Sequence, residues 1–156
     1  VPRHPERGDA VAALLRAAGL SFTRRSLGDA PGGAVYLADT LGELGSWYAL
    51  TDIVFLGGSL RPIGGHNPFE VAHAGAAVLS GSHVFNFAET FAEMEIAGAA
   101  RLVADAGDLA DQVALLLLDA HARRRAQTAA TAYIDAQANR LDDIASELAA
   151  ALELSA

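Results

Sequence analysis

A short apolar run, a glycine-rich loop and a helix-start signal follow one another between residues 53 and 70. The run at residues 53–56 stops at paired glycines, and Asn67, Pro68 and Glu70 then suit the N-cap, first and third positions of a helix. Strand, loop and helix N-terminus in this order are typical of an open α/β sheet, in which ligands bind beyond the carboxyl ends of the strands. Because a helix N-terminus presents unpaired N–H groups and the positive end of a dipole, the segment predicts an α/β fold that binds a phosphorylated ligand.

Strand and helix signals alternate along most of the chain. Strands are expected at residues 21–26, 34–38, 53–56, 77–80 and 101–104, and helices at residues 8–18, 40–50, 68–74, 87–97 and 109–118. Gly19 is placed to end the first helix, and Thr40 with Glu43 forms a capping pattern that opens the second. Such alternation needs crossover connections, and therefore predicts a doubly wound α/β fold with a mostly parallel sheet and helices on its faces.

The end of the chain has a different character. Residues 121–156 are alanine-rich and almost wholly helix-forming, and they predict a helical tail with a break near residues 137–139. The length of 156 residues and the hydrophobic fraction of 52% allow one full core. We therefore expect a single domain over residues 1–156.

Charge excludes some classes of partner. The net charge of −8 and the isoelectric point near 4.9 argue against a broad nucleic-acid or anionic-membrane surface, which needs clustered cations. All 11 basic residues are arginine, so a cation that contacts an anion must be a guanidinium group, unless it is a histidine. The absence of cysteine fits a reducing compartment such as the cytoplasm, and no apolar run reaches the roughly 20 residues that span a membrane.

Asn67 and Glu70 have two interpretations. An Asn at an N-cap with a Glu three residues on is an ordinary capping box, and the spacing alone favours that structural role. The neighbouring glycines favour a ligand, because they let a backbone approach it closely, and a carboxylate beside a phosphate site can accept hydrogen bonds from ribose hydroxyls. These glycines are Gly57, Gly58, Gly64 and Gly65. A nucleotide would use both functions.

Arg3 is the first candidate for a phosphate contact. It lies between Pro2 and Pro5, whose fixed φ angles restrict the loop, and such rigidity suits anion binding. An ordinary surface arginine explains the same residue equally well, and Arg61 has the same two interpretations. Residues 1–7 look like a strand end and its functional loop without the strand, so we expect the chain to be part of a longer protein.

Several other kinds of site have little support. His66, His73 and His83 lack the close spacing of metal ligands. The glycine pairs do not follow a first strand, as a dinucleotide fingerprint requires, and neither a GxSxG elbow nor a P-loop occurs. The arginine run at residues 123–125 is most simply a solvated helix face.

Four segments carry a further signal: VPRHPER at residues 1–7, DTLGEL at 39–44, FLGGSL at 55–60 and GGHNPFE at 64–70, with weaker matches at 86–87 and 138–140. In this order they resemble the carboxyl-terminal half of 3-deoxy-D-manno-octulosonic acid (Kdo) transferases, which glycosylate lipid A in lipopolysaccharide synthesis. The histidine-asparagine-proline segment is specific by itself, and the set together is highly specific. The loop at residues 61–63 and the tail beyond Gln137 match poorly.

The resemblance implies a GT-B glycosyltransferase, in which two Rossmann-like halves face a cleft and the carboxyl-terminal half holds the nucleotide sugar. It implies CMP-Kdo as the donor, with no metal or other cofactor in the nucleotide site. The catalytic base, the site for the lipid A precursor and the membrane anchor then belong to an N-terminal half that this chain is expected to lack. Residues 1–156 are expected to be the inactive donor-binding domain of an enzyme at the cytoplasmic side of the bacterial inner membrane.

The resemblance also implies roles for particular residues. Arg3 and Asn67 address the cytidylate phosphate, and Glu70 addresses the ribose. The loops at Gly42 and at residues 57–59 form the remaining edge of the nucleotide site. The expected substrate-binding residues are Arg3, Gly42, Glu43, Gly57, Gly58, Ser59, Gly64, Gly65, His66, Asn67 and Glu70. No catalytic residue is expected in this chain.

Two other functions stay open at this point. The chain could be the donor domain of another GT-B transferase that uses a UDP- or GDP-sugar, in which case a second cation near the glycine loop would serve the diphosphate. It could also be a non-catalytic nucleotide-binding or partner-binding module that uses the helical tail as its interface.

Overall fold

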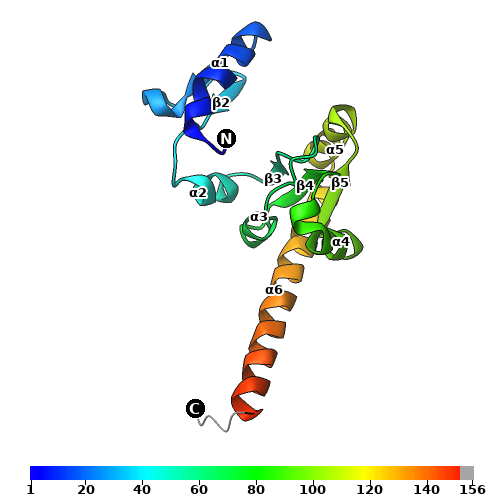
Figure 1. Cartoon of the computed structure of the whole chain (residues 1–156). Coiled ribbons are helices and arrows are strands. Elements are labelled where there is room, and N and C mark those ends of the chain that lie inside the picture. Colours follow the sequence, from blue (N-terminus) through cyan, green and yellow to red (C-terminus); the bar gives the residue numbers. More distant parts are fainter. Residues whose placement is uncertain (152–156) are drawn as a thin grey trace. The chain divides into compact units, whose positions relative to one another are not determined.

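The computed structural model describes residues 1–151 and divides the chain into two compact units, Val1–Trp47 and Tyr48–Ala156 (Figure 1). Both units combine helices with parallel strands, which confirms the predicted α/β class. The strands form two sheets, a pair in the first unit and three strands in the second. The candidate residues are divided in the same way, because Arg3, Gly42 and Glu43 belong to the first unit and those at residues 57–70 to the second.

The first unit is built on one helix and a parallel strand pair. Its elements are the 3-10 helix η1 (Pro5–Arg7), α1 (Gly8–Ala17), β1 (Phe22–Arg24), the 3-10 helix η2 (Arg25–Leu27), β2 (Val35–Leu37) and the start of α2 (Leu44–Ala49). Gly19 adopts a φ of 68° just beyond α1. The N–H groups of Gly19 and Leu20 donate to the carbonyls of Arg16 and Leu15, each at 3.0 Å, so Gly19 ends the helix as predicted.

The predicted opening of the second helix is wrong. Thr40 does not cap a helix, because its hydroxyl donates to the side-chain carboxylate of Glu43. The helix α2 begins at Leu44 instead, and the carbonyl of Glu43 accepts from the N–H of Trp47 at 3.1 Å. The segment at residues 40–43 is therefore a loop.

The second unit holds a three-stranded parallel sheet in the order β3-β4-β5 (Figure 1). Its strands are β3 (Ile53–Leu56), β4 (Ala77–Gly81) and β5 (Ala100–Val103). Its helices are α3 (Phe69–His73), the 3-10 helix η3 (Phe85–Phe87), α4 (Ala88–Ile96), α5 (Ala106–Leu118) and α6 (Ala120–Ala151). The apolar run predicted as a strand thus forms β3 with the expected bounds.

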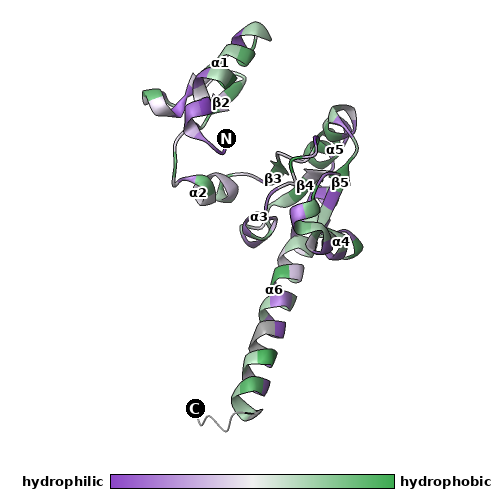
Figure 2. Ribbon diagram, viewed as in Figure 1, coloured by the Kyte–Doolittle hydropathy of each residue, from purple (hydrophilic) through white to green (hydrophobic). Residues whose placement is uncertain are grey.

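Two apolar clusters cover the two faces of this sheet. Because side chains alternate along a strand, Val78 faces one side of β4 and Leu79 the other. Val78 packs in a cluster with the buried Phe91 and Met94 of α4, whereas Leu79 packs with Leu116 of α5. In Figure 2 the strands of this sheet are coloured mostly hydrophobic, while hydrophilic and hydrophobic residues alternate along α6. Helices on both faces are the arrangement that the doubly wound prediction requires.

The predicted break in the tail is wrong, because α6 runs without interruption from Ala120 to Ala151. Asn139 lowers helix propensity by only a fraction of a kcal/mol, roughly 0.6. Tyr133 and Gln137 also anchor the helix, since the Tyr133 hydroxyl and the Gln137 amide donate to Glu93 at 2.9 and 3.2 Å. No helix within residues 1–151 is both long and apolar enough to span a membrane. Residues 152–156 of the predicted tail lie outside the described residues.

The helix α5 begins three residues before the predicted start. Its N-cap is Asp105, whose carboxylate accepts from the N–H groups of Gly107 and Asp108 at 2.8 and 3.0 Å. Apolar periodicity alone starts the helix at Leu109, because the first turn is polar. The capping residue therefore decides the true start.

Candidate functional site

The glycine loop of the second unit follows the carboxyl end of β3, as predicted. Gly58, Gly64 and Gly65 have φ angles of 68°, 111° and 74°, a region that favours glycine. A Cβ atom on Gly64 would overlap the side chain of Asn86. The backbone N–H of Asn86 donates to the Gly64 carbonyl at 3.2 Å. The glycines thus let this loop pack closely on the loop that follows β4.

Ser59 joins the same two loops through its side chain. Its buried hydroxyl donates to the Leu56 carbonyl at 2.6 Å and accepts from the N–H of Gly81 at 2.8 Å. Its carbonyl accepts from the N–H of His83 at 2.9 Å. The hydroxyl is therefore engaged within the protein, and its predicted contact with a ligand stays a prediction.

Asn67 and Glu70 do not form the predicted capping box. The helix α3 begins at Phe69, with Pro68 at the N-cap, and the Asn67 side-chain oxygen accepts from the Phe69 N–H at 3.0 Å. Glu70 is exposed and makes no hydrogen bond or ion pair within residues 1–151. Since α3 has five residues, its dipole is much weaker than the sequence suggests. The carboxylate of Glu70 is consequently free for a ligand.

His66 is partly buried in this loop. Its ring lies over Gly58, where an added Cβ would come within 3.1 Å of His66 Cε1. Its Nδ1 atom is buried and has no hydrogen-bond partner among the described residues. Within residues 1–151, no three His, Asp or Glu side chains are grouped to hold a metal ion.

Arg3 and Gly42 are exposed in the first unit. Arg3 lies in the loop before η1 and makes no hydrogen bond or ion pair with any other described residue. Gly42 has a φ of 81°, and nothing lies within 4 Å of the place that a Cβ would take. Both positions are therefore open to an outside molecule.

Glu43 is engaged by its own unit. Arg25 donates from Nη2 to Glu43 Oε1 at 2.6 Å and from Nε to both carboxylate oxygens at 3.1 and 3.2 Å. These bonds and the one from Thr40 lower the pKa of Glu43 to about 2. The residue is ionised at neutral pH, and its charge is already paired.

A second ion pair lies at the start of the same loop. Asp39 is buried and accepts from Arg24 Nε and from the N–H and hydroxyl of Ser26, the latter two at 3.0 and 2.8 Å. Burial raises the pKa of Asp39, but these bonds together hold it below its ordinary value. Arg24 also donates from Nη1 to Asp9 at 2.6 Å. Sequence reasoning missed this pair, although adjacent arginines in a strand and an Asp after the next strand were a readable signal.

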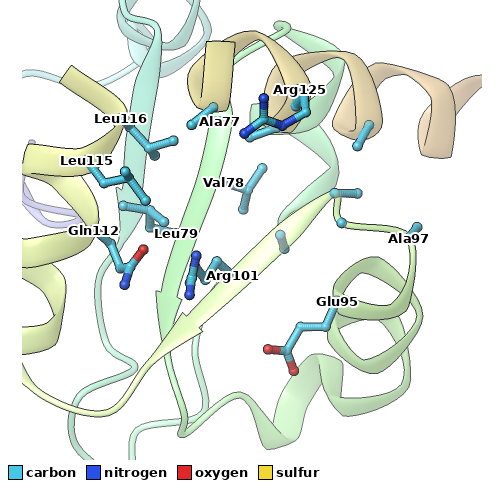
Figure 3. Close-up of a pocket in the computed structure, with 16 residues that line it drawn as sticks. Ala77, Val78, Leu79, Glu95, Ala97, Arg101, Gln112, Leu115, Leu116 and Arg125 are labelled. Carbon is cyan, nitrogen blue, oxygen red and sulfur yellow. The ribbon is translucent and has the colours of Figure 1, made fainter. Parts of the chain in front are cut away.

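A cavity of about 580 Å³ lies elsewhere in the second unit (Figure 3). Its walls include Ala77 and Ala100, the first residues of β4 and β5, together with Leu116 and Arg125 of α5 and α6. The candidate loop instead follows the carboxyl end of β3. None of the predicted substrate-binding residues is among those that line this cavity.

Comparison with known proteins gives the family. A crystal structure described as the C-terminal CMP-Kdo binding domain of WaaA from Acinetobacter baumannii is 37% identical to this chain, with a TM-score of 0.80. The match covers 83% of this chain and 69% of that one. The chain belongs to the Kdo transferase family. The resemblance read from the motifs is thus confirmed.

Curated Kdo transferases agree with this assignment. The chain is 44% identical to that of Bordetella pertussis over 142 residues, which are 88% of this chain and 33% of the relative. It is 41% identical to that of Haemophilus influenzae over 128 residues, 80% of this chain and 30% of the relative. The chain therefore spans about a third of the length of these transferases. No family model matches the sequence.

The matched proteins differ from the other functions that the sequence left open. The curated relatives are named as Kdo transferases, which are not non-catalytic modules. The matched domain is described as binding CMP-Kdo, which is neither a UDP- nor a GDP-sugar.

Proposed function

We propose that this chain is the donor-binding domain of an enzyme that transfers Kdo from CMP-Kdo to a lipid A precursor. The observation that carries the proposal is the structural match to the CMP-Kdo binding domain, at a TM-score of 0.80 and 37% identity. That match covers 83% of the chain and both of its units contain motif residues. The donor would bind without a metal or other cofactor.

We assign the phosphate of the donor to Arg3 and Asn67, and the ribose to Glu70. Two features support the assignment. Arg3 and Glu70 are exposed and have no hydrogen-bond partner within residues 1–151, so neither must give up a contact to bind. The Asn67 oxygen is used by Phe69, which leaves its amide N–H₂ group as a donor suited to an anion.

In the proposed reaction, an acceptor hydroxyl attacks the anomeric carbon of Kdo while the bond from that carbon to the CMP phosphate oxygen breaks. The bonding electron pair passes to the phosphate, and the hydroxyl proton passes to a general base. Negative charge therefore grows on phosphate oxygens in the transition state. A donor that reaches that position, the role proposed for the Arg3 guanidinium, stabilises the transition state more than the ground state.

The general base and the acceptor site are assigned to the N-terminal half of the parent enzyme, as is its attachment at the cytoplasmic side of the inner membrane. The chain spans about a third of the curated transferases, which leaves room for such a half in the relatives. None of the candidate residues in this chain is assigned as a base. Binding and transfer are consequently separable functions.

The first prediction concerns Arg3. Arg3→Ala is expected to weaken CMP binding by about tenfold or more and to leave cytidine binding nearly unchanged, because a guanidinium group pairs with phosphate and not with the nucleoside. Isothermal titration with both ligands measures this. Arg124→Ala on the exposed surface of α6 is the matched control. Failure of the unmodified chain to bind CMP would contradict the proposed function, and equal losses for CMP and cytidine would remove Arg3 from the phosphate site.

The second prediction is that the chain alone transfers no sugar. With CMP-Kdo and a lipid A precursor, mass spectrometry should detect no glycosylated product, although the chain binds CMP in the same buffer. A full-length Kdo transferase such as that of Bordetella pertussis is the positive control. Product formed by the chain alone at a comparable rate would show that the base lies within these residues.

A further inference from the structure

The segment at residues 39–43 is held at both ends by adjacent arginines. Arg24 is the last residue of β1, and Arg25 is the first residue of η2. Arg24 binds Asp39 at the start of the segment, and Arg25 binds Glu43 at its end. We call Arg24, Arg25, Asp39 and Glu43 the arginine clamp.

The Asp39 end of the clamp is the buried one. The side chains of Arg24 and Asp39 are 15% and 1% exposed. Gly8, the first residue of α1, packs on this pair so closely that an added Cβ would lie 2.6 Å from Arg24 Nη2. The pair therefore also packs against the start of α1, which follows η1 and the loop that carries Arg3.

The Glu43 end leaves no acceptor oxygen of that side chain unused. Oε1 accepts from Arg25 Nη2 at 2.6 Å, and Oε2 accepts from Arg25 Nε at 3.1 Å and from the Thr40 hydroxyl. A ligand hydroxyl that bound Glu43 would share its carboxylate with these donors. Glu70, by contrast, has no such partner within residues 1–151.

Between the two ends, residues 41 and 42 are exposed and pack against little of the unit. Leu41 is 75% exposed, and Gly42 has open space on its Cα. The segment belongs to no helix or strand until α2 begins at Leu44. Its conformation therefore depends on how its ends are held.

We propose that the arginine clamp holds residues 40–42 in place for the nucleotide, and that Glu43 is a positioning residue that does not touch the ligand. This inference rests on the proposed function, since it names how one edge of that nucleotide site is ordered. It reassigns Glu43, which the sequence predicts as a ligand contact. The binding edge is then the backbone of residues 40–42.

Exchange of the two charges tests this assignment. Glu43→Arg and Arg25→Glu should each weaken CMP binding by about tenfold, because each places like charges together and releases the loop. The double variant Arg25→Glu with Glu43→Arg should recover affinity to within about threefold of the unmodified chain, since the pair is restored with its charges reversed. Isothermal titration measures all four affinities.

The contrary results are distinct. If Glu43 touches the nucleotide, Glu43→Arg and the double variant will bind equally weakly, while Arg25→Glu binds normally. Unchanged affinity in both single variants would also overturn the inference. Asp111→Arg, at an exposed position of α5, controls for the effect of an added positive charge on an anionic ligand.

A second readout works without a ligand. Amide hydrogen exchange at Trp47, whose backbone N–H donates to the Glu43 carbonyl at 3.1 Å, should accelerate in each single variant and slow again in the double variant. The milder Glu43→Gln keeps the test valid if a charge reversal unfolds the unit, and it should also accelerate exchange. If the unmodified chain fails to bind CMP, the proposed function is wrong. Unchanged exchange in every variant would show instead that the clamp does not order the loop.

Discussion

Gly81→Ala is expected to destabilise the second unit by about 3 kcal/mol, the upper part of the range for overpacking a closely packed site. A Cβ atom on Gly81 would overlap the carbonyl of Ser59 and lie 2.6 Å from the backbone nitrogen of Leu60. These are backbone atoms, which cannot rotate away as a side chain can. Ser59 is also held by hydrogen bonds to Leu56 and Gly81 itself, so the glycine loop must shift as a whole. Urea unfolding followed by far-UV circular dichroism measures the loss.

Gly57→Ala is the matched control for this variant. Gly57 lies in the same loop, has no positive φ, and nothing lies within 4 Å of an added Cβ. Its stability should stay within about 1 kcal/mol of the unmodified chain. If both variants unfold at the same urea concentration, close packing of Gly81 on Ser59 is not the reason why Gly81→Ala lowers stability. The Gly81 variant should also lose CMP affinity, because the loop carries His66 and Asn67.

Asp39→Ala is expected to destabilise the first unit by about 3 to 5 kcal/mol, as removal of one partner from a buried ion pair does. Asp39 is 2% exposed, and its loss leaves the guanidinium of Arg24 without its buried counter-charge and Ser26 without its acceptor. Trp47 is the single tryptophan and packs against Tyr36 in this unit, so its fluorescence reports the unfolding. Asp9→Ala removes the other carboxylate bound by Arg24.

Because the side chain of Asp9 is 88% exposed, Asp9→Ala should lower the stability of the first unit by less than about 1 kcal/mol. Equal losses in the two variants would show that burial of the pair is not what makes Asp39 important. Asp39→Asn keeps the shape of the side chain and tests the charge alone. The stability of Asp39→Asn should lie between those of Asp39→Ala and Asp9→Ala.

The two ion pairs of the first unit should make its stability depend on pH in the acid range. The folded protein holds the pKa of Asp39 below 3.8, and that of Glu43 near 2 against an ordinary 4.5. A carboxyl with a lowered folded pKa contributes stability above its unfolded value and loses that contribution as the pH falls toward the folded value. The first unit should therefore lose stability between about pH 4.5 and pH 2, and Asp39→Asn should flatten this dependence. An acid titration of Trp47 fluorescence that is identical in both proteins would contradict the assignment.

Sequence patterns were enough to predict the class of fold and the family. Alternating strand and helix patterns predict parallel strands with helices on both faces, because each element's burial is encoded in its own periodicity. The run Ile53–Leu56 and the helix end at Gly19 are correct for the same reason, since both depend on residues within one turn or one strand. The N-cap Asp105 is also a local signal, although the apolar periodicity predicted a later start for this helix.

Which candidate residues already bind another part of the chain depends on contacts between segments that are distant in sequence. Glu43 binds Arg25, 18 residues away, and the Ser59 hydroxyl binds Gly81, 22 residues away. Spacing along the chain identifies neighbours within a helix or a turn, but such pairs depend on which strands and loops the fold brings together. The same reason explains the continuous α6, where Glu93 of another helix holds Tyr133 and Gln137 beside the predicted break. A motif can thus name Glu43 and Glu70 alike, while the folded chain pairs the first with Arg25 and leaves the second free for a ligand.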